Sequence, residues 1–362
     1  MKKCITALLL LFTLSVTSLL ACTSADKPES ATGKTSKTSK SINDKKTDLT
    51  PVTLNEVAHS IFYAPMYVAI EKNYFEKEGI DLSLVTGFGA DKTMTAVLSG
   101  TADIGFMGSE ASIYTYNEGA RDYVVNFAQL TQRAGNFLVA REDIKNFKWE
   151  DLKGRKVIGG RKGGMPEMVF EYILKQNHID PAFDLTIDQN IDFGSTAAAF
   201  AEEKADYDFT VEFEPGATNL EKQEKGYVVA SLGTDSGYVP YTAFSAKKSY
   251  ISQHPEIIQG FTNALQKGMN YVASHTPEEI AQVIAPQFKE TTPDTITTIV
   301  SRYYEQDTWK KDLIFRQESF DLLQDILEDA GELKKRAPYK NLVTTIYAEK
   351  SAKAVKDTTL SH

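Results

Sequence analysis

The chain has 362 residues, of which 42% are hydrophobic and 25% charged, an ordinary globular composition that predicts about two domains. Because residues 1–50 hold eight of the 40 basic and four of the 49 acidic residues, residues 51–362 carry a net charge of −13. Such an acidic body disfavours binding to nucleic acid, since every contact with a phosphate would have to overcome electrostatic repulsion. The two cysteines are Cys4 and Cys22, which excludes a disulfide scaffold, thiol catalysis and cysteine-ligated zinc in residues 51–362.

The first 22 residues have the pattern of a bacterial export signal. Two lysines precede an apolar run over residues 5–21, which is shorter than the ~20 residues that a membrane-spanning helix usually needs. The run ends in the letters LLAC, which resemble a lipobox, whose cysteine is lipidated and becomes the first residue of the mature protein. We therefore predict a signal peptide over residues 1–21 and lipidation of Cys22, with an uncleaved anchor as the alternative.

The segment that follows, residues 22–50, has no aromatic and almost no apolar side chain. Such a segment buries too little surface to offset the entropy lost on ordering, so we expect a disordered tether. A lipid, a tether and an acidic body together predict a protein anchored to the extracytoplasmic face of the cell membrane.

Strand and helix patterns alternate from residue 52 to residue 130. Alternating or short buried apolar runs predict strands over residues 52–57, 80–86, 102–107 and 123–130. Helical spacing predicts helices over residues 67–77, 91–99 and 109–118, with Gly79 and Gly100 ending the first two. Strands that alternate with helices indicate a parallel sheet covered by helices on both faces.

The same unit recurs after residue 155 and is followed by a helical segment. We expect strands over residues 156–159, near 187 and over 208–211, helices over 167–176 and 196–203, and a return of the chain over 238–245. Four helices follow over residues 256–274, 277–285, 293–306 and 317–330, the middle two capped by Thr276 and Thr292. The doubling predicts lobe 1 from residues 51–137 and 243–350, lobe 2 from residues 138–242, and a ligand cleft between them.

Three stretches carry a family resemblance: APMYVAIEKNYFEKEGI at residues 64–80, LSGTADIG at 98–105 and DLKGRKV at 151–157. They resemble signatures of the thiamin-pyrimidine-synthase-like family, which contains solute-binding proteins of ABC importers for sulfonates, taurine, nitrate and thiamin pyrimidine precursors. The likeness covers about residues 52–350. It implies an α/β, two-lobed periplasmic-binding-protein-like fold of type II, a small-molecule ligand, and an ABC permease with its ATPase as partners. Tyr63 stands where pyrimidine-binding relatives often carry histidine.

Candidate ligand contacts lie in the loops between predicted strands and helices. Phe62 and Tyr63 offer flat faces to a planar ligand, although either ring can instead pack beneath its loop. Ser109 is a candidate N-cap and Glu110 favours the positive helix end, which is also a sufficient structural explanation. The remaining candidates are the glycine turn Gly163, Gly164 and Met165, the N-cap candidate Ser195, the Glu212-Phe213-Glu214 segment and Tyr241.

The Glu212-Phe213-Glu214-Pro215 segment ends a predicted strand with two acids around an aromatic ring. Pro215 favours a turn, in which the two carboxylates diverge and only one of them faces the ligand. Buried carboxylates need partners, and either ligand N–H groups or a salt bridge to Arg133 would supply them.

Aromatic faces beside carboxylates favour a planar, nitrogen-rich ligand such as a thiamin pyrimidine precursor. The alternative is a sulfonate, taurine or nitrate site, which needs convergent donors and positive charge. We expect no cofactor and no metal, because the five histidines are scattered and no hydrolase, metalloprotease or nucleotide motif is present. Two less favoured functions are a pyrimidine synthase, against which the cysteine-free body argues, and a ligand sensor. We expect a monomer.

Overall fold

The computed structural model describes residues 49–192 and 194–359. The predicted signal peptide, the predicted lipidation site Cys22 and nearly all of the predicted tether lie outside the described residues. Within the described ranges, no helix combines the length and the apolar character needed to cross a membrane.

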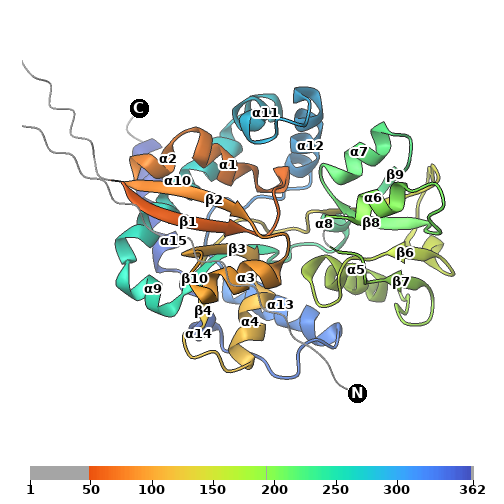
Figure 1. Ribbon diagram of the computed structural model, residues 1–362, viewed down its shortest axis with the longest axis horizontal. Helices are drawn as coiled ribbons and strands as arrows, with labels where there is room; N and C mark the ends of the chain where they lie inside the picture. The colour runs from red at the N-terminus through yellow and green to blue at the C-terminus, as the bar shows by residue number, and fades with distance from the viewer. Residues whose placement is uncertain (1–48, 193, 360–362) are drawn as a thin grey trace, which may run out of the picture. The chain divides into compact units, whose positions relative to one another are not determined.

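The first sheet has five strands in the order β2-β1-β3-β10-β4 (Figure 1). The β1 strand pairs in parallel with β2 and β3, whereas β10 runs antiparallel to both β3 and β4. The expectation of a parallel sheet is therefore wrong for β10, because the chain returns from the second sheet and enters this one from the opposite end. The strands are β1 Thr50–Glu56, β2 Ile80–Thr86, β3 Ile104–Gly108, β4 Val124–Gln129 and β10 Thr242–Lys247.

The second sheet also has five strands, in the order β7-β6-β8-β5-β9. The β6 strand is parallel to β7 and β8, and β5 is antiparallel to β8 and β9. Neither β5 nor β9 was expected from the sequence. The strands are β5 Asn136–Ala140, β6 Lys156–Ile158, β7 Thr186–Asp188, β8 Phe209–Phe213 and β9 Tyr227–Ser231.

Helices connect the strands of both sheets. The helix expected over residues 67–77 starts earlier, at Ala64, and is two helices, because Asn73 takes a left-handed conformation with φ of 54°. The helices among the strands are α1 Ala64–Glu71, α2 Tyr74–Lys77, α3 Ala90–Ser99, α4 Glu110–Asn117, α5 Met165–Gln176, α6 Thr196–Ala201, α7 Gly216–Lys222 and α8 Leu232–Asp235, with 3-10 turns η1 Ile61–Tyr63 and η2 Trp149–Leu152.

The chain after β10 is helical, as expected. Thr276 accepts a hydrogen bond from the Glu279 backbone N–H, and Thr292 accepts one from that of Thr295, so both predicted caps are confirmed. The helices are α9 Lys248–Gln253, α10 Pro255–Ser274, α11 Pro277–Ile284, η3 Ala285–Gln287, α12 Pro293–Glu305, α13 Gln317–Asp329, α14 Tyr339–Leu342 and α15 Ile346–Thr359.

Aromatic rings fill the space between the first sheet and α10. Phe106 of β3 stacks on Phe244 of β10 with ring centroids 4.0 Å apart, and Phe261 of α10 meets Phe244 edge-on at 5.4 Å. All three side chains are completely buried. This packing fixes the end of β3, from which the loop to α4 enters the cavity described next.

Candidate ligand-binding site

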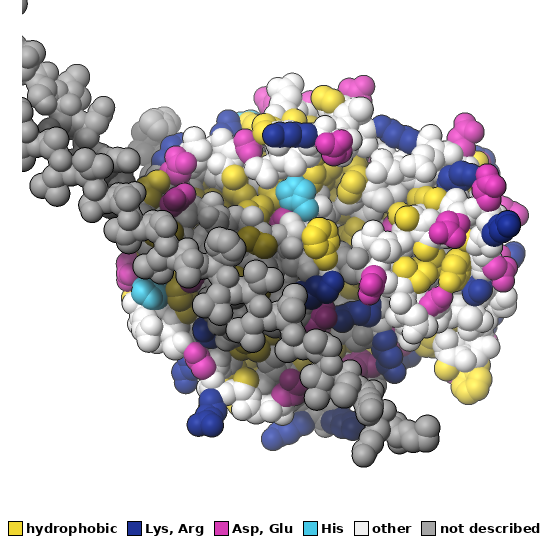
Figure 2. Space-filling view, in the orientation of Figure 1, with side chains coloured by type: hydrophobic (Ala, Val, Ile, Leu, Met, Phe, Trp, Pro, Cys, Tyr) yellow, Lys and Arg dark blue, Asp and Glu magenta, His cyan; other side chains and the backbone are white. Residues whose placement is uncertain are grey.

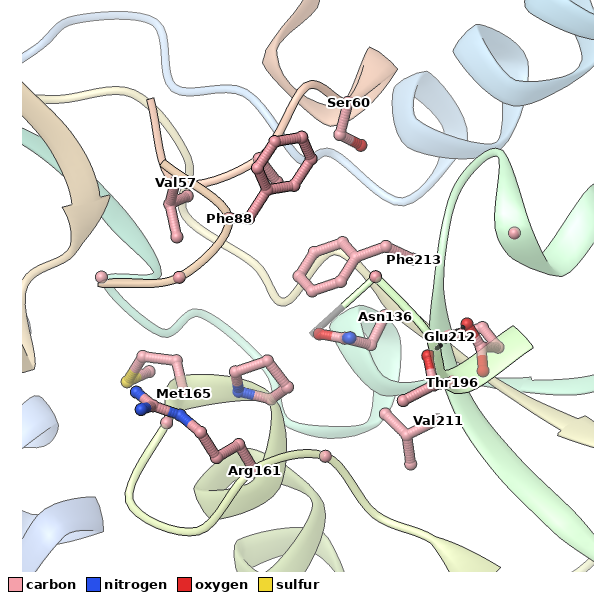
Figure 3. Close-up of a pocket in the computed structure, with 18 of the residues that line it drawn as sticks. Val57, Ser60, Phe88, Asn136, Arg161, Met165, Thr196, Val211, Glu212 and Phe213 are labelled. Atoms are coloured by element: carbon pink, nitrogen blue, oxygen red, sulfur yellow. Dashed lines mark hydrogen bonds between the residues drawn. The ribbon is translucent and has the colours of Figure 1, made fainter. Parts of the chain in front are cut away.

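One cavity, with a volume of about 350 Å³, is lined by loops that follow strands of both sheets (Figure 3). What we call the first-sheet wall comprises residues 57–60, 63, 88–90, 108, 110, 241 and 242. The second-sheet wall comprises residues 136, 160, 161, 164–166, 191, 194, 196, 197, 211–216 and 219. Figure 2 shows apolar side chains on the visible face among interspersed basic and acidic ones.

Glu110 is a buried carboxyl of the first-sheet wall. It is 2% exposed, and its Oε2 atom has no hydrogen-bond partner among the described residues. Burial raises the pKa of Glu110 to about 7, although the charge of Arg161 and the Met165 backbone N–H partly offset that rise. A Cβ at Gly108 would lie 2.1 Å from Glu110 Oε2, so the carboxyl reaches its position only because residue 108 has no side chain.

Glu212 is the corresponding buried carboxyl of the second-sheet wall. Thr210 Oγ1 donates to its Oε1 at 2.6 Å and Thr196 Oγ1 donates to its Oε2 at 3.0 Å. Burial raises the pKa of Glu212 to about 7, the two hydroxyls lower it, and the charge of Glu214 raises it further. The group is held by hydroxyls rather than by a cation, so part of its desolvation remains uncompensated.

Glu214 also lines the cavity, but its carboxylate is already paired. Arg302 Nη1 of α12 lies 2.7 Å from Glu214 Oε1, and the backbone N–H of Thr218 donates to Oε2 at 2.9 Å. The two acids of the segment therefore have separate partners. The expected alternative partner, Arg133, is not the cation involved, because it donates to the Gly233 carbonyl instead. Sequence reasoning missed Arg302, which lies 88 residues further along the chain.

Three aromatic rings lie on the cavity surface or just beneath it. Tyr63 and Tyr241 are each 2% exposed, and Phe213 contacts Tyr241 with ring centroids 6.1 Å apart. The Tyr241 hydroxyl donates to Asn136 Oδ1, whereas the Tyr63 hydroxyl has no hydrogen-bond partner among the described residues. Tyr63 therefore contributes an aromatic side chain to the lining of the cavity, with a hydroxyl that no described residue binds.

Arg161 extends from the second-sheet wall toward the first. Its Nη1 atom lies 3.2 Å from Asp91 Oδ2 of α3, and both side chains are about half exposed. The Tyr114 hydroxyl of α4 donates to the Gly163 carbonyl at 3.1 Å, a second link between the walls. Among the described residues that line the cavity, Arg161 is the only lysine or arginine.

Eight of the predicted contacts line the cavity and four do not. The eight are Tyr63, Glu110, Gly164, Met165, Glu212, Phe213, Glu214 and Tyr241. Phe62 is fully buried beneath them and packs on Tyr303 at 5.2 Å. Gly163 is outside the lining, although its carbonyl accepts the bond from Tyr114.

Neither of the two serines predicted as N-caps makes a capping hydrogen bond. Ser109 and Ser195 both stand at N-cap positions, but neither side chain accepts a hydrogen bond from its helix. The Ser109 hydroxyl instead donates to the Pro240 carbonyl at 3.2 Å, because it is buried against the segment that leads into β10. Neither residue lines the cavity.

The His59 ring is held by contacts with two neighbouring groups. His59 Nδ1 lies 2.8 Å from Glu56 Oε1, and Nε2 lies 2.9 Å from the Gln287 carbonyl. Glu56 thereby raises the pKa of His59. These contacts fix the ring in the wall. In the described part of the chain, no group of three or more His, Cys, Asp or Glu residues is placed to hold a metal ion.

Further residues line the cavity without being among the predicted contacts, and Phe88 is one of them. Asn136, the first residue of β5, also lines it. Phe88 lies two residues after a predicted strand and between two glycines, a pattern that could have identified it.

Two mixed sheets with a cavity at their strand ends define the α/β, two-lobed fold of periplasmic binding proteins, as expected from the sequence. The nitrate-binding protein NrtA from Synechocystis PCC 6803 has a similar structure, with a TM-score of 0.68 and 15% identity over 85% of this chain and 89% of that one. The alkanesulfonate-binding protein SsuA from Xanthomonas axonopodis pv. citri, bound to MOPS, gives 0.66 and 14% over 82% and 98%.

Sequence comparison identifies the family to which the chain belongs. Residues 61–280 match the family described as NMT1/THI5 like. The binding protein YtlA of Bacillus subtilis (strain 168) is 47% identical over 302 residues, which are 83% of this chain and 90% of YtlA. The chain belongs to the NMT1/THI5-like family, and the family resemblance seen in the sequence is confirmed.

Proposed function

We propose that this protein is a solute receptor of an ABC importer. It captures a small, planar, nitrogen-containing ligand, such as a thiamin pyrimidine precursor, and delivers it to the permease and its ATPase. The name of YtlA as a binding protein supports the receptor role, as do the nitrate- and alkanesulfonate-binding proteins that share the fold. The family description supports a link to pyrimidine chemistry.

The observation that carries the ligand class is the pair of carboxyls Glu110 and Glu212. They enter one cavity from its two walls, and neither has an ion-pair partner among the described residues. Burying a carboxylate without compensation costs free energy, which N–H donors on a ligand recover. A ligand with donors on two edges would satisfy both groups at once.

The aromatic lining favours a flat ligand over a tetrahedral one. Tyr63, Phe213 and Tyr241 border the same space, and offset or edge contacts with a planar ring add about 0.5–1.5 kcal/mol beyond burial. Together with the carboxyls, this lining describes an aminopyrimidine better than a sulfonate.

A ligand that contacts both walls also explains how binding can be signalled. A closed population of about 1% rises to about 99% only if the ligand prefers the closed state by roughly 5.5 kcal/mol. Contacts to Glu110 on one wall and Glu212 on the other exist together only when the walls are close, so they supply that preference.

One residue favours the alternative of a sulfonate, taurine or nitrate ligand. Arg161 lines the cavity and carries the positive charge that an anion needs, although it is engaged with Asp91. An anion would also require Glu110 and Glu212 to be protonated. Because the pKa of each is about 7, anion binding would strengthen as the pH falls through that value.

The proposed location follows from the amino terminus. Lipidation at Cys22 and a flexible tether would hold the receptor at the extracytoplasmic face of the cell membrane, within reach of its permease. This part of the proposal is supported by the sequence pattern of residues 1–50.

The test is isothermal titration calorimetry with 4-amino-5-hydroxymethyl-2-methylpyrimidine, taurine and nitrate. We expect the parent protein to bind the aminopyrimidine, and Glu110→Gln or Glu212→Gln to weaken it by about 1.5–3 kcal/mol, the range for a charge-assisted bond. Glu278→Gln, the same change at an exposed position outside the cavity, should leave affinity unchanged. Binding of taurine or nitrate alone, tightened by the two cavity substitutions, would contradict the proposal.

A further inference from the structure

The loop between β2 and α3 presents a single aromatic side chain at the cavity. Phe88 lines the cavity and is 58% exposed. Of the exposed large hydrophobic side chains in the described ranges, it is the only one on the cavity surface. It takes no part in the hydrophobic core, so folding does not account for a phenylalanine here.

The backbone of Phe88 is strained. Its φ of 56° lies in the left-handed region, where a bulky aromatic residue is a genuine outlier. Residues kept in such conformations cluster at ligand clamps and active sites, because the surrounding structure has to maintain them against their own preference.

Hydrogen bonds on both sides of Phe88 keep the loop in place. The Gly87 N–H donates to the Glu56 carbonyl at 2.8 Å, and the Gly89 N–H donates to the Val57 carbonyl at 3.0 Å. Gly89 has a φ of 140°, which excludes other residues. With both neighbours tied to the end of β1, the Phe88 ring is held out from a fixed point of the first-sheet wall.

A second aromatic ring faces this one from the other wall. Phe213 ends β8, and Figure 3 shows Phe88 and Phe213 extending from the two walls into the same pocket. Beside Phe88, Asp91 makes the 3.2 Å ion pair with Arg161 of the opposite wall. A flat ligand that entered between the two rings would cover the exposed surface of Phe88.

We propose that Phe88 is a ligand-recognition residue that covers one flat face of a planar heterocycle and so selects it over tetrahedral or trigonal anions. The assignment rests on the proposed function and extends it by naming the residue that selects a planar ligand. The rigid loop prepares the ring before binding, so little ordering entropy is lost when the ligand arrives.

The experiment compares Phe88→Ala, Phe88→Gly and Phe88→Tyr with the parent by calorimetric titration of 4-amino-5-hydroxymethyl-2-methylpyrimidine. Loss of the ring should weaken binding about 5- to 150-fold in the first two variants, the range for loss of stacking on a base. Phe88→Tyr should stay close to the parent. Glycine accepts the left-handed backbone, so Phe88→Gly should keep the melting temperature of the ligand-free protein.

His178→Gly is the matched control, because His178 has a φ of 57° and is exposed outside the cavity. It should leave affinity unchanged. If the parent binds the aminopyrimidine and Phe88→Ala and Phe88→Gly bind it equally well, the role of Phe88 is wrong while the proposed function stands. If the parent does not bind it, the proposed function is wrong, and the ligand class assigned to Phe88 is wrong with it.

Discussion

Glu212→Gln replaces a buried, cation-free carboxyl with an amide of nearly the same shape. The amide oxygen can still accept from one of the hydroxyls of Thr210 and Thr196, and the amide nitrogen can donate to the other. The substitution therefore removes the ionisation of residue 212 while leaving most of its contacts. We predict that its effect on the stability of the ligand-free protein depends strongly on pH.

The size of that effect follows from the pKa of Glu212 in the folded and unfolded chain. The pKa of Glu212 is about 7 in the folded chain, against an ordinary value of 4.5. This difference corresponds to about 3 kcal/mol in the free energy of unfolding. A carboxyl whose pKa is raised by folding destabilises the folded state once it ionises. The parent therefore loses stability as the pH rises from about 4.5 to about 7, and Glu212→Gln does not incur that loss.

The assay is urea unfolding of the parent and Glu212→Gln at about pH 5 and about pH 8, followed by tryptophan fluorescence. Trp149 packs on Phe170 beside the second sheet and Trp309 donates to the Phe62 carbonyl, so the two report on different regions. We expect the stability of the variant relative to the parent to rise by about 2.5 kcal/mol between the two pH values, because a small part of the loss has already occurred at about pH 5.

Glu214→Gln is the matched control for this prediction, since it makes the same change two residues away. Its carboxylate is paired with Arg302, so the amide should destabilise the protein at about pH 8 by about 1.5–3 kcal/mol. A stability difference between parent and Glu212→Gln that is the same at both pH values would refute the reasoning about uncompensated burial.

Three further substitutions test separate parts of the structure. Gly108→Ala places a Cβ where Glu110 Oε2 now lies, so aminopyrimidine affinity should fall in calorimetric titration, and unchanged affinity would contradict the role of this close approach. Thr276→Ala removes a helix cap and should lower the free energy of unfolding in urea by about 1 kcal/mol; no change would mean that the cap contributes nothing. Cys22→Ala should move the protein from the membrane fraction to the soluble fraction, and retention in membranes would favour the uncleaved anchor.

The sequence predicted those strands and helices that are determined by patterns among neighbouring residues. The β2 strand matches its predicted range because polar and apolar residues alternate along it, and α11 begins where Thr276 and a following proline indicated. The β5 strand was missed because it is short and fully buried, and its partner β8 lies about 70 residues further along the chain. No local pattern reports such a pairing.

The same limit applies to the cavity. Strand-end positions identified Glu110 and Glu212 as candidates, because a carboxylate next to a buried strand stands out in the sequence. Which acid remains without a cation depends on Arg302 of a distant helix. The strain of Phe88 depends on backbone hydrogen bonds to the end of β1, and these require the folded chain.

The central claim is that ligand N–H groups pair with the cavity carboxyls. The direct test is a double-mutant cycle between ligand and protein, measured by calorimetry. The parent, Glu110→Gln and Glu212→Gln are each titrated with the aminopyrimidine and with its N,N-dimethylamino analogue, which lacks the exocyclic N–H donors. The account predicts a coupling energy of about 1.5–3 kcal/mol with at least one of the two carboxyls. Coupling near zero with both would contradict it.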